Sequence, residues 1–492
     1  MSQNQETENF QLRNWELVSI NPNIRNWVWS DYFNFWAVSI QSVIGFSLIA
    51  SLYLIYDLNS LIVLSGCLIA TFLIFILINI IGKTSQSTGL PFPVILRLSM
   101  GYNGARYIGM LRGLVGIFMF GVQTFFISKS IGYLIRIFLY QIDNQILNNE
   151  FLLMFFFGLN PLDWFSILIT LLFQVYLFTK GQEANRKFIK FSALFVYFGL
   201  FIFFIMIISE NYNEVINSIT LSTSFNNVVS KENVLPLLYV SGTMFTYFSI
   251  LVLSFGDFSR YAKDKDEMQF GNFSLFFNLI IFSLFAILLT IGSDIILTKN
   301  SISAERLLTN PNDIIAKFDN STLTVFSLIF ILISMFSTNL IANYVPSQNA
   351  LINFFPNSMT LNKASYVIVF LSLIVAGFWL SIFSNPNILN FFDILSAFFG
   401  PIFGVVVADY YFIKKQKINH KELFYPKENS EYIYSSGWNY KAMYSLFIGF
   451  IFSVSTIWNA NLTSLQSFAW IIGAFVSYII YYLLAKKITK NA

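Results

Sequence analysis

Twelve long apolar segments constrain this chain more than any other feature of its sequence. A transmembrane helix needs ~20 mostly apolar residues. The segments lie near 34–56, 60–81, 106–139, 162–179, 188–209, 236–256, 273–297, 322–345, 364–384, 388–413, 442–459 and 467–486. Backbone polar groups in lipid must be paired within their own segment, so we expect each span to be a helix. The sequence therefore predicts an all-α polytopic membrane protein with about 12 transmembrane helices.

Composition excludes several other classes of protein. The 492 residues are 56% hydrophobic and only 11% charged, against about 25% charged in an ordinary soluble domain. A single cysteine, Cys67, and a single histidine, His420, argue against disulfides, multi-ligand metal sites and Ser-His-Asp chemistry. The net charge of +4 is spread over short loops, which suits a protein facing anionic lipid rather than nucleic acid. We expect a lipid bilayer as partner and no obligate protein partner.

The lysines and arginines indicate how the chain crosses the membrane. Most of the 29 fall in segments on one side, which the positive-inside rule makes cytoplasmic. Both termini are then cytoplasmic in a cell (inner) membrane protein, and the start lacks the apolar core of a cleaved signal peptide. The expected organisation is an N-terminal tail at 1–33, five helices at 34–209, an external loop at 210–235, five helices at 236–413, a cytoplasmic loop at 414–441, and two helices with a tail at 442–492.

Two spans are interrupted by small and polar residues. The span at 34–56 carries Gln41, Ser42 and Gly45, and the span at 236–256 carries Gly242 and Thr246. Interrupted helices at corresponding places in two halves indicate an inverted-repeat transporter with its site at the midplane. The alternative is that these small residues only let neighbouring helices pack closely.

The span at 322–345 carries two polar stripes. Ser334, Ser337 and Thr338 share one face at helical spacing, and Asn339 and Asn343 share another. The hydroxyls suit a small hard cation, unless they bond to carbonyls of their own helix. The amides suit a neutral ligand with donors and acceptors, unless they only join helices.

Further side chains in the spans could meet a ligand or the lipid interface. Gln41 and Gln123 are amides in apolar surroundings, and together with Asn343 they could pair with both edges of a planar imide or ureide. Lys129 lies about 9 Å beyond Gln123 along the helix. We interpret it as a lysine that snorkels to the outer interface.

Four sequence blocks resemble the nucleobase–cation symporter-1 family, in particular its uracil, allantoin and hydantoin permeases. The blocks lie in order at Arg25–Trp36, Gly89–Gly101 continuing to Phe120–Thr124, Asp257–Tyr261 and Gly400–Tyr411. The resemblance runs from about Arg25 to Phe424, which is most of the chain. It implies a LeuT-like fold of two inverted five-helix repeats plus two C-terminal helices, and substrate–cation symport by alternating access.

The resemblance also implies which residues form the sites. Substrate contacts would come from Gln41, Gln123 and Asn343. A sodium ion would be bound by the main-chain carbonyls of Ala37, Ile40 and Ser334 and by the hydroxyls of Ser337 and Thr338. Where close family members place two tryptophans around the substrate ring, this chain has Met119 and Phe248, so its substrate remains open. We interpret Asp257 and Arg260 as an ion pair with a structural or gating role at the cytoplasmic end of their span, and Asp409 in the same way; proton coupling is the alternative.

We therefore predict a symporter that imports a nucleobase or related ureide, such as uracil, allantoin or a hydantoin. It would bind no cofactor besides sodium, or a proton, as coupling ion. A carrier of the same fold for another solute, such as a thiamine-precursor pyrimidine or an amino acid, remains an alternative. A membrane-embedded transferase is a remote one, because an enzyme would need a cluster of His, Asp or metal ligands; we predict that the chain is not an enzyme.

Overall fold

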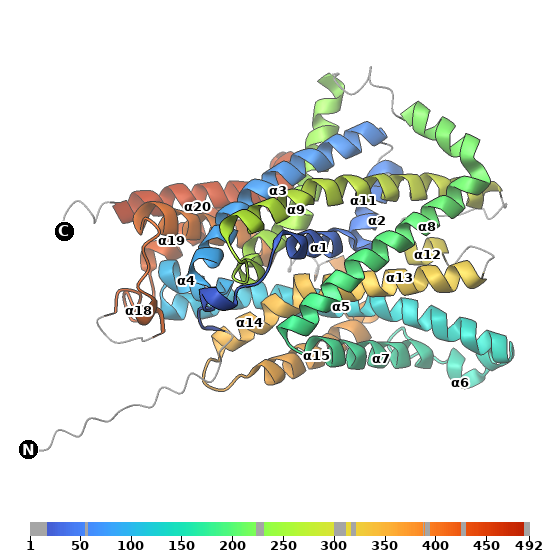
Figure 1. Cartoon of the computed structure of the whole chain (residues 1–492), viewed down its shortest axis with the longest axis horizontal. Helices are drawn as coiled ribbons and strands as arrows, with labels where there is room; N and C mark the ends of the chain where they lie inside the picture. Colours follow the sequence, from blue (N-terminus) through green and yellow to red (C-terminus); the bar gives the residue numbers. More distant parts are fainter. Residues whose placement is uncertain are drawn as a thin grey trace, which may run out of the picture.

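The computed structural model describes residues 17–54, 58–222, 231–299, 311–315, 321–386, 388, 394–424 and 430–486. Long helices that lie side by side make up most of this part (Figure 1), and it contains isolated bridges but no strand. Parts of the predicted N-terminal tail, of the loops at 210–235 and 414–441, and of the C-terminal tail fall outside the described residues.

Ten described helices are long and apolar enough to cross a membrane. They comprise α3 (Ser60–Thr88), α5 (Tyr102–Ile142), α7 (Pro161–Phe178), α8 (Gln182–Ser222), α9 (Val234–Ser254), α11 (Lys265–Lys299), the pair α13 (Ser321–Asn339) and α14 (Val345–Phe354), the span Ile394–Ile413 that contains α17 (Phe399–Val407), α19 (Tyr440–Trp458) and α20 (Ala469–Lys486). The bent pair α1 (Trp29–Ile40) and α2 (Val43–Leu54) adds an eleventh span, and α15 (Leu361–Gly377) is a shorter apolar helix. These twelve coincide with the twelve predicted segments, and the predicted helical fold is confirmed.

Short elements connect the spans. They are η2 (Pro22–Ile24), α4 (Phe92–Met100), η3 (Ile146–Asn148), α6 (Glu150–Leu153), η5 (Lys231–Asn233), α10 (Gly256–Ser259), α12 (Pro311–Ile315), η6 (Leu340–Tyr344), η7 (Trp379–Phe383), η8 (Ala408–Ile413), α18 (His420–Phe424) and η9 (Ala460–Phe468).

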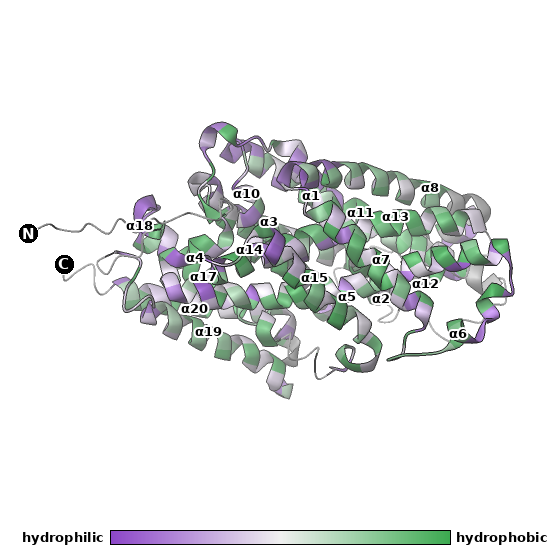
Figure 2. Cartoon of the chain, turned by 90° about the horizontal axis from the view of Figure 1, so that it is seen from below, coloured by the Kyte–Doolittle hydropathy of each residue, from purple (hydrophilic) through white to green (hydrophobic). Residues whose placement is uncertain are grey.

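Large apolar side chains remain exposed along the outside of the long helices. Phe72, Leu172 and Phe198 are each more than half exposed. Figure 2 shows apolar residues along most of the helices and hydrophilic residues towards the two ends of the molecule, near α18 at one end and near α6 at the other. Such extensive exposed apolar surface is expected where lipid, rather than water, surrounds the protein.

The predicted interruption of the first span is present. The axes of α1 and α2 differ by 58° across a break at Gln41 and Ser42. The Ser42 hydroxyl accepts a hydrogen bond from the backbone N–H of Gly45 at 2.9 Å, which caps the start of α2. The break leaves polar backbone groups of α1 in the middle of the bundle.

The second predicted interruption is absent. Helix α9 runs without a break from Val234 to Ser254. Its small residues serve packing instead: a Cβ on Gly242 would lie 2.3 Å from Ser467 of η9, and the Thr246 hydroxyl donates to the Ser467 carbonyl at 2.8 Å. The prediction of a broken helix here was wrong because close helix packing selects the same small polar residues as a break does.

A π-helical turn interrupts the span that carries both polar stripes. Helix α13 ends at Asn339, η6 forms one π-helical turn, and α14 continues from Val345. Pro346 follows directly and has no N–H to donate to the carbonyl four residues earlier. Such single π-turns are frequent at functional sites, and this one contains Asn343.

Candidate functional site

A cavity of about 390 Å³ lies between α5, α9, η6 and α17. Of the residues predicted to bind substrate or cation, five line it: Met119, Gln123, Phe248, Thr338 and Asn343. Its walls are mostly apolar with a few polar groups, as is usual for a small-molecule site.

A chain of three side-chain amides crosses from α5 to η6 beside the cavity. Asn343 donates from Nδ2 to Gln123 Oε1 at 2.9 Å and to Asn339 Oδ1 at 2.8 Å. Asn339 in turn donates to the Phe120 carbonyl at 3.3 Å, and Gln123 donates to the Met335 carbonyl at 3.4 Å. These bonds fix the two cavity-lining amides and use the Asn343 donor, while no described residue donates to Asn343 Oδ1.

Met119 and Phe248 also line this cavity, on α5 and α9 respectively. Phe248 is almost fully buried and packs edge-on against Tyr247, with 4.8 Å between ring centroids. A thioether and a phenyl ring can both contact the face of a planar ligand. The two residues thus lie where the resemblance implies ring contacts.

Gln41 does not line this cavity. It lies at the break between α1 and α2, beside a separate space of about 60 Å³ bounded by α8, α11 and α13. The side chain is 2% exposed, and neither Oε1 nor Nε2 has a hydrogen-bond partner among the described residues. The polar group that faces it is the Tyr197 hydroxyl. The structure therefore does not bring Gln41 together with Gln123 and Asn343.

Two of the three hydroxyls of the predicted cation stripe join α13 to the end of α1, and Thr338 also donates to the Ser334 carbonyl of its own helix at 2.9 Å. Ser334 donates to the Gln41 carbonyl, and Thr338 donates to the Val38 carbonyl at 2.8 Å. Ser337 instead donates to Ile333 and Ser334 carbonyls of its own helix, at 3.0 and 2.9 Å, as in the alternative interpretation.

The predicted carbonyl ligands lie at the same junction. Ala37 accepts from the Gln41 N–H at 3.1 Å, and Ile40 accepts from the Ser42 N–H at 2.7 Å. The predicted ligand atoms are all hydroxyl and carbonyl oxygens, which suit a hard cation. The described residues contain no group of three or more His, Cys, Asp or Glu side chains that could bind a metal ion.

Asp257 lies beyond the end of α9 and is 1% exposed. Its Oδ1 accepts from the Phe92 N–H at 3.1 Å, while Oδ2 has no hydrogen-bond partner within 3.5 Å among the described residues, although Asn349 faces the carboxyl. Burial raises the pKa of Asp257 to about 7, and the Arg260 charge offsets this only in part. Arg260 itself donates to the Val18 carbonyl at 3.0 Å.

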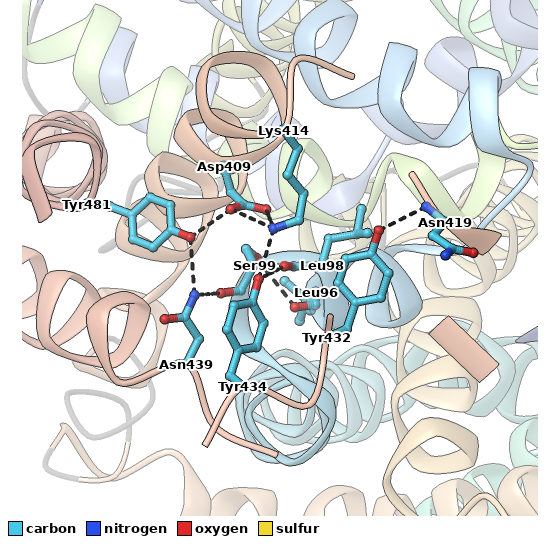
Figure 3. A network of polar contacts seen from close by, with 10 residues as sticks. All are labelled: Leu96, Leu98, Ser99, Asp409, Lys414, Asn419, Tyr432, Tyr434, Asn439 and Tyr481. Atoms are coloured by element: carbon cyan, nitrogen blue, oxygen red, sulfur yellow. Dashed lines mark hydrogen bonds and ion pairs between the residues drawn. The ribbon is translucent and has the colours of Figure 1, made fainter. Parts of the chain in front are cut away.

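Asp409, by contrast, has close partners (Figure 3). Lys414 lies 3.1 Å from it, and Tyr481 donates to Oδ1 at 2.7 Å. Asn439 connects Tyr481 to the Ser99 carbonyl, at 3.2 and 2.7 Å. This network joins η8, α20 and the segment before α19 to α4, in agreement with the structural role expected for Asp409.

Two intramembrane cations on α5 differ in their surroundings. Lys129 is half-buried, with Nζ 5.1 Å from the centroid of the Phe125 ring. Arg112 is 1% exposed and donates to the carbonyl of Ala342, which lines the cavity. The sequence predicted no role for Arg112. Its position eleven residues before Gln123, hence on nearly the same helix face, was the signal available.

Comparison with known proteins places this geometry in a family. The model of the family described as "Permease for cytosine/purines, uracil, thiamine, allantoin" matches residues 19–482. The chain belongs to this permease family.

Curated relatives of this permease are similar over most of their length. An allantoin permease of Bacillus subtilis is 24% identical over 478 residues, which cover 96% of this chain and 93% of that protein. The purine-uracil permease NCS1 of Arabidopsis thaliana is 25% identical over 89% of this chain and 70% of that protein.

Solved structures show the same fold. MHP1, a nucleobase-cation-symport-1 family transporter in a closed conformation with bromovinylhydantoin bound, matches with a TM-score of 0.72 at 16% identity, over 98% of this chain and 96% of that one. A Na⁺-coupled sialic acid symporter matches with a TM-score of 0.63 at 12% identity, over 95% and 91%. The predicted LeuT-like fold is confirmed by these matches.

Proposed function

We propose that this permease is a secondary active transporter that imports a nucleobase or related ureide by cation symport. The observation that carries the proposal is the amide chain beside the 390 Å³ cavity, in which Gln123 and Asn343 are held by other amides. The relatives named for allantoin, purine and uracil transport support the substrate class.

The amide pair suits a ligand with an imide or ureide edge. Asn343 Oδ1 has no donor among the described residues and can accept from a ring N–H. A ligand that bonds to fixed amides avoids leaving a buried acceptor unpaired. Met119 and Phe248 contact the ring faces in this proposal, and the flexible thioether accommodates a less planar ureide such as allantoin.

Gln41 is proposed as a third contact, made when the α1–α2 break moves. Its buried amide has no hydrogen-bond partner among the described residues, an arrangement that costs free energy. Turning towards the larger cavity in the presence of substrate would give the amide partners.

Sodium is proposed as the coupling ion at the junction of α1 and α13. The Ala37, Ile40 and Ser334 carbonyls and the Ser337 and Thr338 hydroxyls would bind it. An ion there would stabilise the closed arrangement of the two helices in place of the hydroxyl–carbonyl bonds, and coupling to substrate must be reciprocal. We place the protein in the cell membrane with both termini cytoplasmic, as its charge distribution predicts, and assign it transport without an enzymatic step.

The test is uptake by purified protein in sealed proteoliposomes. With an inward sodium gradient, we expect labelled allantoin to accumulate above its external concentration, and unlabelled hydantoin or uracil to compete while amino acids do not. Gln123→Ala liposomes with equal protein content serve as the matched control and should accumulate far less. Absence of accumulation of allantoin, hydantoin and uracil alike in the wild type would refute the proposal.

A further inference from the structure

Arg112 carries a buried guanidinium in the interior of the helix bundle, where apolar side chains are usual. It is 1% exposed and lies eleven residues before Gln123 on α5, about 16 Å along the helix and about 20° from the same face. Ionisable side chains inside a membrane are rare and usually functional.

Its closest partner is the Ala342 carbonyl, to which Pro346 cannot donate. In an α-helix, the Ala342 carbonyl would accept from the nitrogen of residue 346, which in this chain is a proline without an N–H. Arg112 Nη2 lies 2.6 Å from the Ala342 oxygen and donates to it. A charged donor thus replaces the missing backbone bond in the π-turn, next to Asn343.

The same guanidinium contacts two further helices that enclose the cavity. Nη2 lies 3.3 Å from the Ser254 hydroxyl at the end of α9, and the group lies 6.0 Å from the centroid of Phe399 on α17. Ala342 and Phe399 both line the cavity. Arg112 therefore lies behind the part of the cavity wall formed by Ala342 and Phe399, which we call the cavity floor.

A glycine on α5 leaves room for this arrangement. A Cβ on Gly116 would lie 2.8 Å from Arg112 Nη1, 2.2 Å from the Ser347 hydroxyl and 3.2 Å from the Asn343 carbonyl. The backbone of α5 can thus approach the π-turn closely at this point.

Arg112 is poorly explained as a stabilising residue. Its Nε and Nη1 have no hydrogen-bond partner among the described residues, and the opposite charge that acts on it, Asp257, forms no ion pair with it among them. A buried charge that is incompletely paired is unfavourable, and an apolar side chain of similar size is often as stable. A role in positioning the site explains why this arrangement is retained.

We propose that Arg112 is a positioning residue for substrate recognition: it holds the proline-freed Ala342 carbonyl and thereby fixes the π-turn that presents Asn343 to the ligand. It acts through Asn343 and does not touch the substrate. The inference rests on the proposed function for Asn343 as a substrate contact and for allantoin as the probe.

The first test is a double-mutant cycle on allantoin binding to the purified full chain. Arg112→Gln should weaken binding about tenfold, the equivalent of one lost hydrogen bond. In an Asn343→Ala background the same change should have less than about a twofold effect, because the residue through which it acts is gone. Arg112→Lys, which keeps a charged donor, should restore part of the affinity.

The matched control is Arg106, also on α5. It donates from Nε and Nη2 to the Phe354 carbonyl at 3.0 and 2.8 Å, at the far end of α14 and away from the cavity. Arg106→Gln should leave allantoin affinity unchanged within about twofold. Additive losses from Arg112→Gln and Asn343→Ala would overturn the proposal, because additivity indicates independent sites.

A second test needs no ligand. In a Cys67→Ser background, Ala342→Cys places a single thiol in the cavity wall, and its reaction rate with a methanethiosulfonate reagent reports the position of the π-turn. Adding Arg112→Gln should change that rate at least about fivefold, and adding Arg106→Gln should not. An unchanged rate would overturn the proposal. If the wild type fails to bind allantoin, that failure counts against the proposed function, while the labelling rates still decide the role of Arg112.

Discussion

Two buried clusters of charge show opposite degrees of pairing. Asp409 lies 3.1 Å from Lys414 and 2.7 Å from the Tyr481 hydroxyl, within a network that reaches α4 (Figure 3). Asp409 Oδ2 has no hydrogen-bond partner among the described residues, but it lies 3.1 Å from the charged Lys414 Nζ. Arg112 and Asp257 are equally buried and opposite in charge, yet no such ion pair joins them among the described residues, and each keeps a polar atom without a hydrogen-bond partner there.

The difference indicates that the Asp409 network keeps one arrangement, whereas the helices around Arg112 and Asp257 change their arrangement during transport. A buried carboxylate that lies beside a cation and accepts a hydrogen bond from a hydroxyl strongly favours that one arrangement. Incompletely paired charges between α5, η6 and the end of α9 gain partners if these helices shift. Alternating access needs such an element with two arrangements of similar free energy. We therefore expect the first cluster to govern stability and the cavity floor to govern ligand binding.

Breaking the paired cluster should have the largest effect on folding. Lys414→Met leaves the Asp409 carboxyl buried without its cation, and we expect a loss of about 3–5 kcal/mol in stability. Thermal unfolding in detergent measures it, with the exposed Lys417→Met as control. Allantoin affinity of the folded fraction should not change. A variant with the melting temperature of the wild type would show that this ion pair does not stabilise the fold.

Breaking the amide chain should lower allantoin affinity more than it lowers the stability of the fold. Gln123→Ala removes a ligand contact and the acceptor for Asn343, so allantoin affinity should fall by about 1–3 kcal/mol, measured by calorimetry.

A buried amide outside the cavity provides the comparison for Gln123. Gln174 on α7 accepts from the Thr124 hydroxyl at 3.1 Å and lines no part of the 390 Å³ cavity. Gln174→Ala should lower the melting temperature without changing allantoin affinity. Equal losses of affinity in both variants would mean that neither amide contacts the ligand specifically.

The smallest expected effect is a pH dependence from Asp257. Its folded-state pKa of about 7 lies above the ordinary 3.8, so the folded protein binds an extra proton between these values. The corresponding contribution to stability is complete below about pH 4 and is lost as the pH rises through about 7.

The check is the melting temperature of wild type and Asp257→Asn across that pH window. The wild type should lose stability towards neutral pH relative to Asp257→Asn, which mimics the neutral carboxyl at every pH. Parallel curves for the two proteins would show that Asp257 does not titrate there.

The helical fold and much of the site could be predicted from sequence. Backbone groups in lipid leave few options besides helices, so apolar length alone identified the spans. Helical spacing predicts that Asn339 and Asn343 share one face, and the structure shows that this face contacts α5. Met119, Gln123 and Phe248, inferred from the resemblance, line one cavity with Asn343.

What could not be predicted depends on which neighbour a side chain meets. The small residues of α9 pack against η9, a contact between segments more than 200 positions apart. Gln41 lies at the predicted break, but the side of the break that it faces depends on α8 and α11. The role of Arg112 depends on Pro346, which lies 234 positions later and frees a carbonyl in another helix.

In the proposed mechanism, substrate and sodium bind to coupled sites on α5, η6 and the α1–α13 junction. The most direct test is allantoin binding to purified protein with and without sodium, in the wild type and in Thr338→Ala. We expect sodium to tighten allantoin binding in the wild type and this effect of sodium to be lost in Thr338→Ala. Allantoin binding that is indifferent to sodium in the wild type, or equally tightened by sodium in Thr338→Ala, would contradict it.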